Sequence, residues 1–296
     1  TMKTKIGKKV LPVFLSLLLL IGLAPTTVFA AGDMYIYIGD IDIVNSTTHS
    51  VPCGDGTITY DTASKVLTLG NATLTSEDTS KAVIRGSSEV SGVNPEVKIV
   101  VKGENTITAP MAIDFKGANL SFSGSGKLVI NGGSVGIRSR VYNTGSGSIS
   151  FSDGVNVTVK LTGGDPDTSA GYWGWPAVCA NGDALSINNA TIYVENKGGR
   201  GIAGSGVSIL NGSEVTSIVD TTVEAGHDYN AFLISNGGLN VQNSTLTAKV
   251  LNGPDMGLVL GGTGDVTFKD SIVTVSAAGG GYGICLSQFA GAFTIN

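Results

Sequence analysis

The sequence predicts an all-β protein, a right-handed parallel β-helix of about eight to nine coils with an N-terminal cap. Three observations support this fold class. A motif of two short strands around an Asx turn recurs along the chain, a small residue followed by an apolar one recurs between its copies, and Asn or Asp returns at nearly one position of the turn. Repeats of about 20–50 residues are typical of stacked coils rather than of a globule closed around one core.

The paired-strand motif has eight copies, and their starts lie 22 to 36 residues apart. The copies read LTLGNATLTS from Leu67, VKIVVKGENTITA from Val97, LSFSGSGKLVING from Leu120, ISFSDGVNVTVKL from Ile149, LSINNATIYVENK from Leu185, VSILNGSEVTSIV from Val207, LNVQNSTLTAKVL from Leu239 and VTFKDSIVTVSAA from Val266. The turn between the strands carries Asn71, Asn105, Asn189, Asn243 and Asp270. We expect these residues to adopt the left-handed conformation and to ladder their side chains between coils.

The second recurring element predicts a third strand in each coil. Aligning its copies places an apolar residue in one column, and the residue after it varies freely. The column consists of Val83, Ile113, Ile137, Val178, Ile202, Phe232, Leu258 and Ile284. An always-apolar position beside a free one is the in/out alternation of a strand, so we expect one buried stack. The crossover rule predicts right-handed coils.

The ends of the chain differ from the repeat. Residues 1–30 have four lysines, an apolar run over 10–23 and a terminal Val28-Phe29-Ala30, which together predict a secretory signal peptide. Residues 31–66 alternate apolar and polar side chains and are predicted to form the N-terminal cap. Residues 67–296 are predicted to be the β-helix, truncated at its C-terminus, with its last coil uncapped. We expect a secreted or cell-surface module of a larger protein, monomeric and not membrane-spanning after signal cleavage.

Charge and cysteine content narrow the function further. Without the first 30 residues the chain has 14 basic and 23 acidic residues, a net charge of −9. Such a chain lacks the basic footprint that nucleic-acid binding needs, and we expect polyanions to require a bridging cation such as calcium. Cys179 and Cys285 occupy one repeat position about four coils apart, roughly 19 Å at the spacing of stacked strands. This exceeds disulfide reach, so isolated thiols are expected, as for Cys53.

The repeat style resembles a known group of proteins. YDTASKVLTLGNATLT, VKIVVKGENTI and SGSGKLVINGGSVGI are similar to segments of the β-helical carbohydrate-binding surface proteins of Gram-positive bacteria and, more distantly, of the pectate-lyase-like superfold. The resemblance covers residues 55–296 and includes no catalytic signature. It implies an exported, often modular surface protein that binds plant or host polysaccharide, in some members with calcium.

Loops that interrupt the repeat are the predicted binding face, because insertions project from one edge of a solenoid. The longest, 162–176, contains both tryptophans of the chain. The predicted ligand-binding residues are Tyr172, Trp173, Trp175, Arg200, His227, Tyr229 and Tyr282, and the predicted calcium ligands are Asp165, Asp167, Asp228 and Asp255. Aromatic faces pack on sugar rings, and carboxylates bind hydroxyls or calcium. In the alternative, the tryptophans cover the solenoid flank and the aspartates cap turns.

Catalytic residues are not assigned. A pectin-degrading hydrolase would need aspartates around a Gly-His-Gly motif, and Gly226-His227-Asp228 stands alone. A lyase would need several calcium carboxylates with an arginine base, whereas Arg138, Arg140 and Arg200 accompany a single strand-like carboxylate, Asp114. The sequence therefore favours a non-catalytic carbohydrate-binding or adhesive module that binds polysaccharide or cell-wall glycan. A polysaccharide lyase or glycoside hydrolase and a passive surface stalk are the alternatives.

Overall fold

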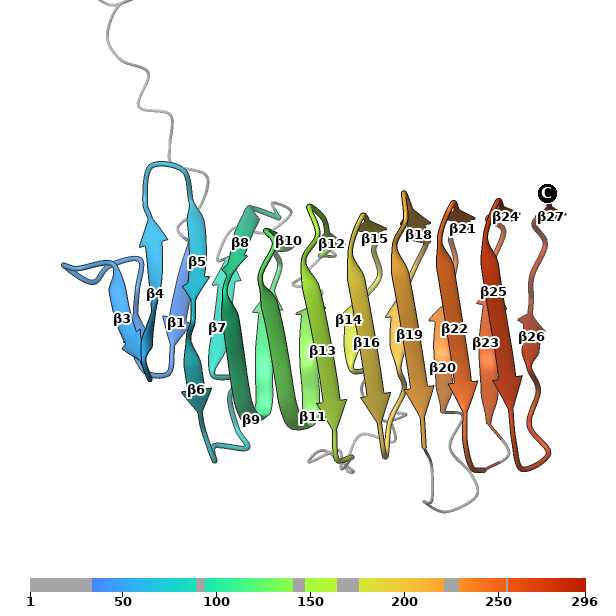
Figure 1. The fold of residues 1–296 in the computed structure, drawn as a ribbon, viewed down its shortest axis with the longest axis horizontal. Helices are drawn as coiled ribbons and strands as arrows, with labels where there is room; N and C mark the ends of the chain where they lie inside the picture. Colours follow the sequence, from blue (N-terminus) through green and yellow to red (C-terminus); the bar gives the residue numbers. More distant parts are fainter. Residues whose placement is uncertain (1–33, 89–93, 141–146, 164–175, 221–228, 254) are drawn as a thin grey trace, which may run out of the picture.

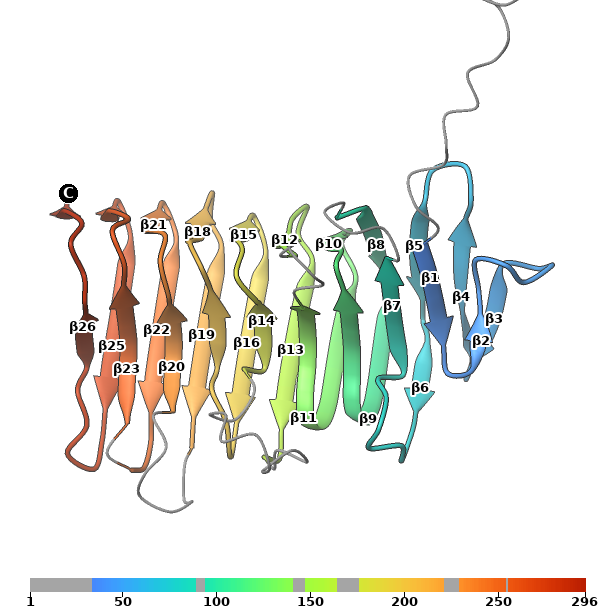
Figure 2. The ribbon, with the colours of Figure 1, turned by 180° about the vertical axis from the view of Figure 1, so that it is seen from behind.

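The computed structural model describes residues 34–88, 94–140, 147–163, 176–220, 229–253 and 255–296. The regular secondary structure in these ranges consists of β-strands alone, arranged in one sheet of 16 strands and one of 11. Successive coils lie side by side along the long axis, from the blue N-terminal strands to the red C-terminal ones (Figures 1 and 2). The fold is a right-handed parallel β-helix, as the repeat predicts.

The 11-stranded sheet contains the first strand of every coil. Its order is β27-β24-β21-β18-β15-β12-β10-β8-β5-β4-β3, and every pair from β5 to β27 is parallel. The strands are β3 (Ser50–Cys53), β4 (Gly56–Asp61), β5 (Val66–Gly70), β8 (Glu96–Lys102), β10 (Asn119–Ser123), β12 (Ile149–Phe151), β15 (Leu185–Asn188), β18 (Val207–Leu210), β21 (Leu239–Gln242), β24 (Val266–Lys269) and β27 (Phe293–Ile295).

The 16-stranded sheet contains the second and third strands of the coils. The second strands are β6 (Thr73–Thr75), β13 (Asn156–Leu161), β16 (Thr191–Asn196), β19 (Glu214–Val219), β22 (Thr245–Val250) and β25 (Ile272–Ala277). The third strands are β7 (Ile84–Ser88), β14 (Val178–Ala180), β17 (Ile202–Gly204), β20 (Asn230–Ile234), β23 (Met256–Gly261) and β26 (Ile284–Ser287). In two coils both strands are continuous, as β9 (Glu104–Lys116) and β11 (Lys127–Arg140). Three strands per coil are therefore confirmed.

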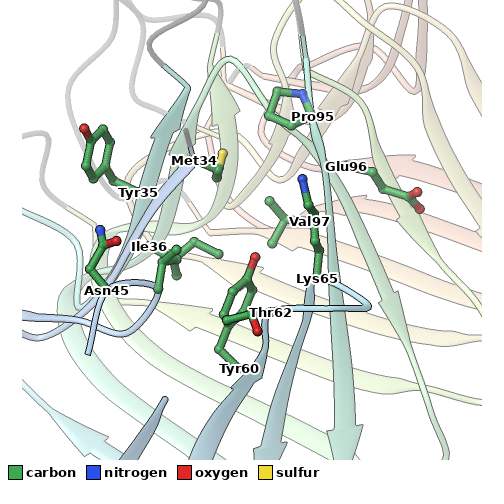
Figure 3. A pocket seen from close by; sticks show the side chains of 11 residues that line it. Met34, Tyr35, Ile36, Asn45, Tyr60, Thr62, Lys65, Pro95, Glu96 and Val97 are labelled. Atoms are coloured by element: carbon green, nitrogen blue, oxygen red, sulfur yellow. The ribbon is translucent and has the colours of Figure 1, made fainter. Parts of the chain in front are cut away.

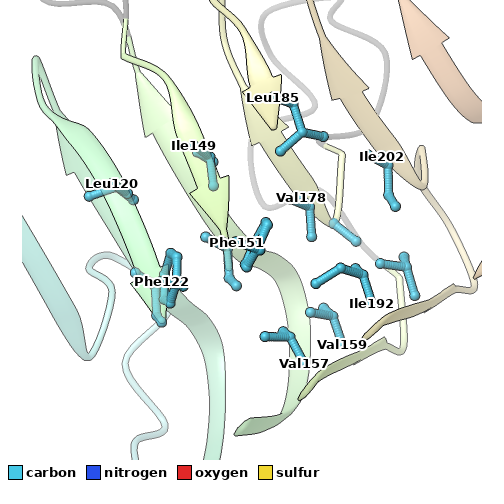
Figure 4. Close-up of a cluster of buried hydrophobic side chains, with 14 of the residues drawn as sticks. Leu120, Phe122, Ile149, Phe151, Val157, Val159, Val178, Leu185, Ile192 and Ile202 are labelled. Carbon is cyan, nitrogen blue, oxygen red and sulfur yellow. The ribbon is translucent and has the colours of Figure 1, made fainter. Parts of the chain in front are cut away.

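Like residues stack above like in the core. Ile113, Ile137, Val178, Ile202, Phe232 and Leu258 are successive Cα partners, and each is fully buried. Figure 4 shows Val178 and Ile202 pointing into the same interior as Leu120, Ile149 and Leu185 of the other sheet. Two aromatic rings add to this packing, because Phe122 and Phe151 stack with ring centroids 5.1 Å apart. The interior is thus a set of continuous apolar columns.

Two ends of the predicted column need correction. Ile84, not Val83, is the partner of Ile113, so the alignment of the first copy was wrong by one residue. Two neighbouring apolar residues make that copy ambiguous, and the antiparallel pairing of β7 with β1 (Met34–Ile38), which sets Ile38 opposite Ile84, fixes the register. Ile284 is in register with Leu258 but 45% exposed, because β26 has no further partner strand among the described residues.

The Asx turns have the predicted backbone conformation at most positions. Asn71, Asn189, Asn243 and Asp270 have φ between 48° and 54°. Asn105 is the exception. It lies within β9, where its buried side chain accepts a hydrogen bond from the Ala72 amide at 2.8 Å and donates to Lys102 O at 3.0 Å, and Gly103 adopts the left-handed conformation in its coil.

The N-terminal strands pair differently from the coils. β1 is antiparallel to β7 and to β2 (Ile41–Asp42), and β4 is antiparallel to both β3 and β5. At the other end, β27 continues the parallel sheet on β24. Ile272, Leu286 and Ile295 there are more than half exposed. Among the described residues, no helix is long and apolar enough to cross a membrane.

The stacked column yields a stability prediction. Ile202→Ala should lower the free energy of unfolding by about 2–5 kcal/mol, because the cavity lies between two coils that cannot close independently. Denaturant unfolding measures this loss. Ile284→Ala, in the same column but 45% exposed, is the matched control and should cost clearly less. Equal losses for the two variants would show that the column does not form one stack.

Candidate functional site

The outer side of the third strands carries a row of residues that the register aligns. We name as the outward row the Cα partners that follow the buried column: Arg85, Asp114, Arg138, Cys179, Ala203, Leu233, Val259 and Cys285. The row changes character along the axis, because its first three members are charged and the others are not. Because Ile84 pairs with Ile113, the next residue, Arg85, lies in this row beside Asp114.

Asp114 is the centre of a compact ion-pair cluster. Arg138 approaches it with two parallel hydrogen bonds, Nε to Oδ1 and Nη2 to Oδ2, both at 3.0 Å. Arg140 donates from Nε to Oδ1 at 3.0 Å, and its Nη2 lies 2.5 Å from Oδ2. The side chains of Asp114 and Arg138 are 5% and 4% exposed, whereas that of Arg140 is 41% exposed. One carboxylate therefore holds two guanidinium groups, one buried and one facing solvent.

Arg85 is held on the other side of Asp114 by the N-terminal strands. Its Nη1 donates to the carbonyls of Gly39 and Ala82, and its guanidinium lies 4.7 Å from the centroid of the Tyr37 ring. Its Nη2 is 3.6 Å from Asp40, which also pairs with Lys81 at 2.5 Å. The hydrogen bond from Lys81 lowers the pKa of Asp40. These contacts fix the Arg85 side chain at the edge of a hollow.

This hollow, the basic pocket, has a volume of about 290 Å³. Its lining consists of Tyr37, Ser80, Lys81, Ala82, Arg85, Gly86, Ser87, Met111, Asp114, Lys116, Arg138 and Arg140. Five of these side chains are cationic. Among the described residues, Asp40 and Asp78 balance Lys81 and Arg85, whereas Arg138 and Arg140 share the single carboxylate of Asp114, which leaves a local excess of positive charge. The whole chain has a net charge of −5, so this positive field is a local exception.

A second hollow of about 290 Å³, the polar pocket, lies further along the same face. Its lining includes Cys179, Asn181, Arg200, Leu233 and Ser235. Cys179 pairs directly with Arg138 of the basic pocket, so the two pockets are neighbours on one sheet. Burial raises the pKa of the Cys179 thiol to about 12, although the charges of Arg138 and Arg200 act in the opposite sense. The thiol is therefore a neutral wall of the pocket.

Two other hollows lie elsewhere. One of about 320 Å³ is at the junction of the N-terminal strands with the first coils, where Ile36, Tyr60 and Val97 gather around it (Figure 3). Its lining has one cation, Lys65, and one carboxylate, Glu96, and so has no charge preference. The other has a volume of about 620 Å³. It is lined by residues of the second strands, such as Lys160 and Glu195, and by Thr162, at the start of the predicted binding insertion.

The predicted loop residues fall into two groups. Tyr172, Trp173, Trp175 and His227, with the predicted calcium ligands Asp165, Asp167 and Asp228, lie outside the described residues, so their assignments stay predictions. Among the others, Arg200 lines the polar pocket and Tyr282 is 68% exposed. Tyr229 and Asp255 are 7% and 4% exposed, and the Tyr229 amide donates to Asp255 Oδ1 at 3.3 Å. Their burial leaves little of either side chain for a ligand.

The described residues contain no group of three His, Cys, Asp or Glu side chains placed to hold a metal ion. All three cysteines are free thiols, and Cys179 and Cys285 share the outward row as predicted. Comparison with protein families, with curated proteins and with solved structures gives no match for this chain. The fold and the surface chemistry therefore carry the functional argument.

The basic pocket is the feature that the sequence analysis did not assign. The sequence indicates Asp114, Arg138 and Arg140 only as parts of an incomplete lyase site, and the column that contains two of them varies freely along the repeat. The signal was nevertheless present, because Asp114 and Arg138 occupy the same position of successive copies. Opposite charges in one column of a parallel stack predict an ion pair between coils.

The ion-pair cluster yields a second stability prediction. Asp114→Asn should lower the free energy of unfolding by about 3–5 kcal/mol, because it leaves the buried Arg138 guanidinium without its charge partner. Asp40→Asn is the control, since Asp40 is 80% exposed. Its loss should stay within about 1 kcal/mol. Denaturant unfolding of both variants measures the difference, and a small loss for Asp114→Asn would contradict the assigned geometry.

The cysteines yield a reactivity prediction. In the native protein at pH 8, iodoacetamide should modify the partly exposed Cys285 first and leave Cys179 unmodified, because only the thiolate reacts and the pKa of Cys179 is raised to about 12. Mass spectrometry of the labelled peptides gives the rates. In guanidinium chloride all three thiols should react alike. Modification of native Cys179 as fast as Cys285 would show that this wall of the polar pocket is open.

Proposed function

We propose that the protein is a secreted or cell-surface β-helix module that binds polysaccharide, without catalysing its cleavage, along the outward face of its third strands. The observation that carries this proposal is the direct adjacency of the basic and polar pockets on one sheet. Together they extend from β7 to β20, roughly 24 Å at the spacing of about 4.8 Å between strands. A linear sugar chain laid along the helix axis would meet one coil after another.

The chemistry of this face suits carbohydrate. The polar pocket offers an amide at Asn181, a hydroxyl at Ser235 and a guanidinium at Arg200, beside the apolar Leu233. The basic pocket adds the hydroxyls of Ser80 and Ser87 and the ring of Tyr37. Sugars need this mixture, because their hydroxyls hydrogen-bond to polar groups while their C–H faces pack on apolar or aromatic surface.

Binding is favoured over catalysis by the state of the acidic group on this face. Asp114 is the one carboxylate of the outward row, all of whose members are described residues, and both of its oxygens are engaged by Arg138 and Arg140. Asp114 therefore acts as a residue that positions Arg138 and Arg140.

The test is retention of the mature protein on a polysaccharide array, with a variant that fills the polar pocket. Ser235 is exposed and lines this pocket, so Ser235→Tyr should reduce retention by about tenfold or more while preserving the fold. Ser208→Tyr is the matched control, because Ser208 lies on the other sheet, in β18. The control should bind like the unchanged protein.

The same array distinguishes the alternatives. Release of reducing ends from a bound glycan would show that the protein is a hydrolase, and release of unsaturated products would show that it is a lyase, rather than a binding module. Equal retention of the two tyrosine variants would move the binding site away from the outward face. If the protein bound none of the polysaccharides on the array, the proposal would be overturned in favour of a passive stalk.

A further inference from the structure

We infer that the basic pocket binds an oxyanion of the ligand, the carboxylate of a uronic acid or a sulfate ester, through its arginines and without calcium. This inference rests on the proposed function and names the class of polysaccharide. It also revises the expectation that an acidic chain needs a bridging cation for an acidic glycan. The pocket itself supplies the positive charge.

The charges within the cluster favour an added anion. The bidentate pair between Arg138 and Asp114 is complete by itself and neutralises the buried guanidinium. Arg140 approaches the same carboxylate, so its positive charge is not matched by a carboxylate of its own. Lys81 and Arg85, by contrast, are balanced by Asp40 and Asp78. An added oxyanion in the pocket would balance this excess.

The arginines of the basic pocket are preorganised. Asp114 fixes the plane of the Arg140 guanidinium, and the Gly39 and Ala82 carbonyls with the Tyr37 ring fix that of Arg85. Arg85 and Arg140 belong to the strands on either side of the strand that carries Asp114, and both side chains line the pocket. A planar fork held in place binds carboxylate and sulfate oxygens more strongly than mobile surface lysines do, because less side-chain freedom is lost on binding.

Two arginines of the basic pocket are accessible to a ligand. The Arg140 side chain is 41% exposed and the Arg85 side chain 24% exposed, and both line the pocket. The hydroxyls of Ser80 and Ser87 lie in the same lining and can donate to an oxyanion or accept from a neighbouring sugar hydroxyl. Charge-assisted hydrogen bonds of this kind are shorter and stronger than those between neutral groups.

The experiment is calorimetric titration in EDTA with four probes. These are an oligogalacturonate, its carboxyl-reduced neutral form, a sulfated galactan oligosaccharide and inorganic sulfate. We expect the acidic oligosaccharides to bind without calcium, the neutral form to bind at least about tenfold more weakly, and added salt to weaken the acidic ligands. Preference between the two acidic oligosaccharides then identifies the oxyanion.

Two variants and a matched control locate the site. Arg140→Gln removes the exposed guanidinium and should weaken acidic ligands by about tenfold or more, with no effect on the neutral form. Ser87→Phe fills the pocket without changing charge and should weaken the same ligands. Lys127→Gln is the control. Lys127 belongs to β11, as Arg140 does, and is 45% exposed, and its replacement removes one positive charge outside the pocket. It should bind like the unchanged protein.

The outcomes separate this inference from the proposed function. Neutral and acidic oligosaccharides of equal affinity, an absolute need for calcium, or equal losses for Arg140→Gln and Lys127→Gln would overturn the oxyanion site and leave polysaccharide binding intact. If no oligosaccharide binds, the proposed function fails. Inorganic sulfate then decides the inference alone: it stands if sulfate raises the melting temperature of the unchanged protein but not of Arg140→Gln, and it falls if both respond alike.

Discussion

Parallel pairing in register from coil to coil is the constraint on which the whole molecule depends. It places each residue above its counterpart in the next coil, so any property that recurs in the sequence becomes a continuous column in space. Apolar residues become the core in this way. The same pairing brings Asp114 beside Arg138, although 24 positions separate them along the chain.

The fold could be predicted because the repeat samples one geometry many times. Seven of the eight copies place the correct residue in the inward column, and the one ambiguous copy does not disturb the fold class. That ambiguity does affect the site. With two adjacent apolar residues, Val83 and Ile84, the alternation is undecided, and only the antiparallel strand β1, outside the repeat, settles it. Asn105 shows the same limit, since its burial follows from contacts to Ala72 and Lys102 rather than from its turn position.

The ion-pair cluster also explains how a strongly acidic chain can present a basic surface. Net charge is a sum over all residues, whereas a ligand experiences the groups near its binding site, and the effect of distant exposed charges is reduced by salt. Asp114 has a double part in this arrangement. It compensates Arg138, which burial would otherwise make costly, and it holds Arg140 at the surface. A carboxylate thereby helps to build a site for anions.

The division between the inward column and the outward row has an evolutionary consequence. Because adjacent residues of one strand face opposite sides, the outward position differs in character from coil to coil, as from Arg138 to Cys179 to Ala203, above one continuous apolar column. Mutations can therefore change the outward row one coil at a time, and duplication of a coil adds one more position to this row. Such a scaffold can diversify its recognition quickly while its architecture stays constant.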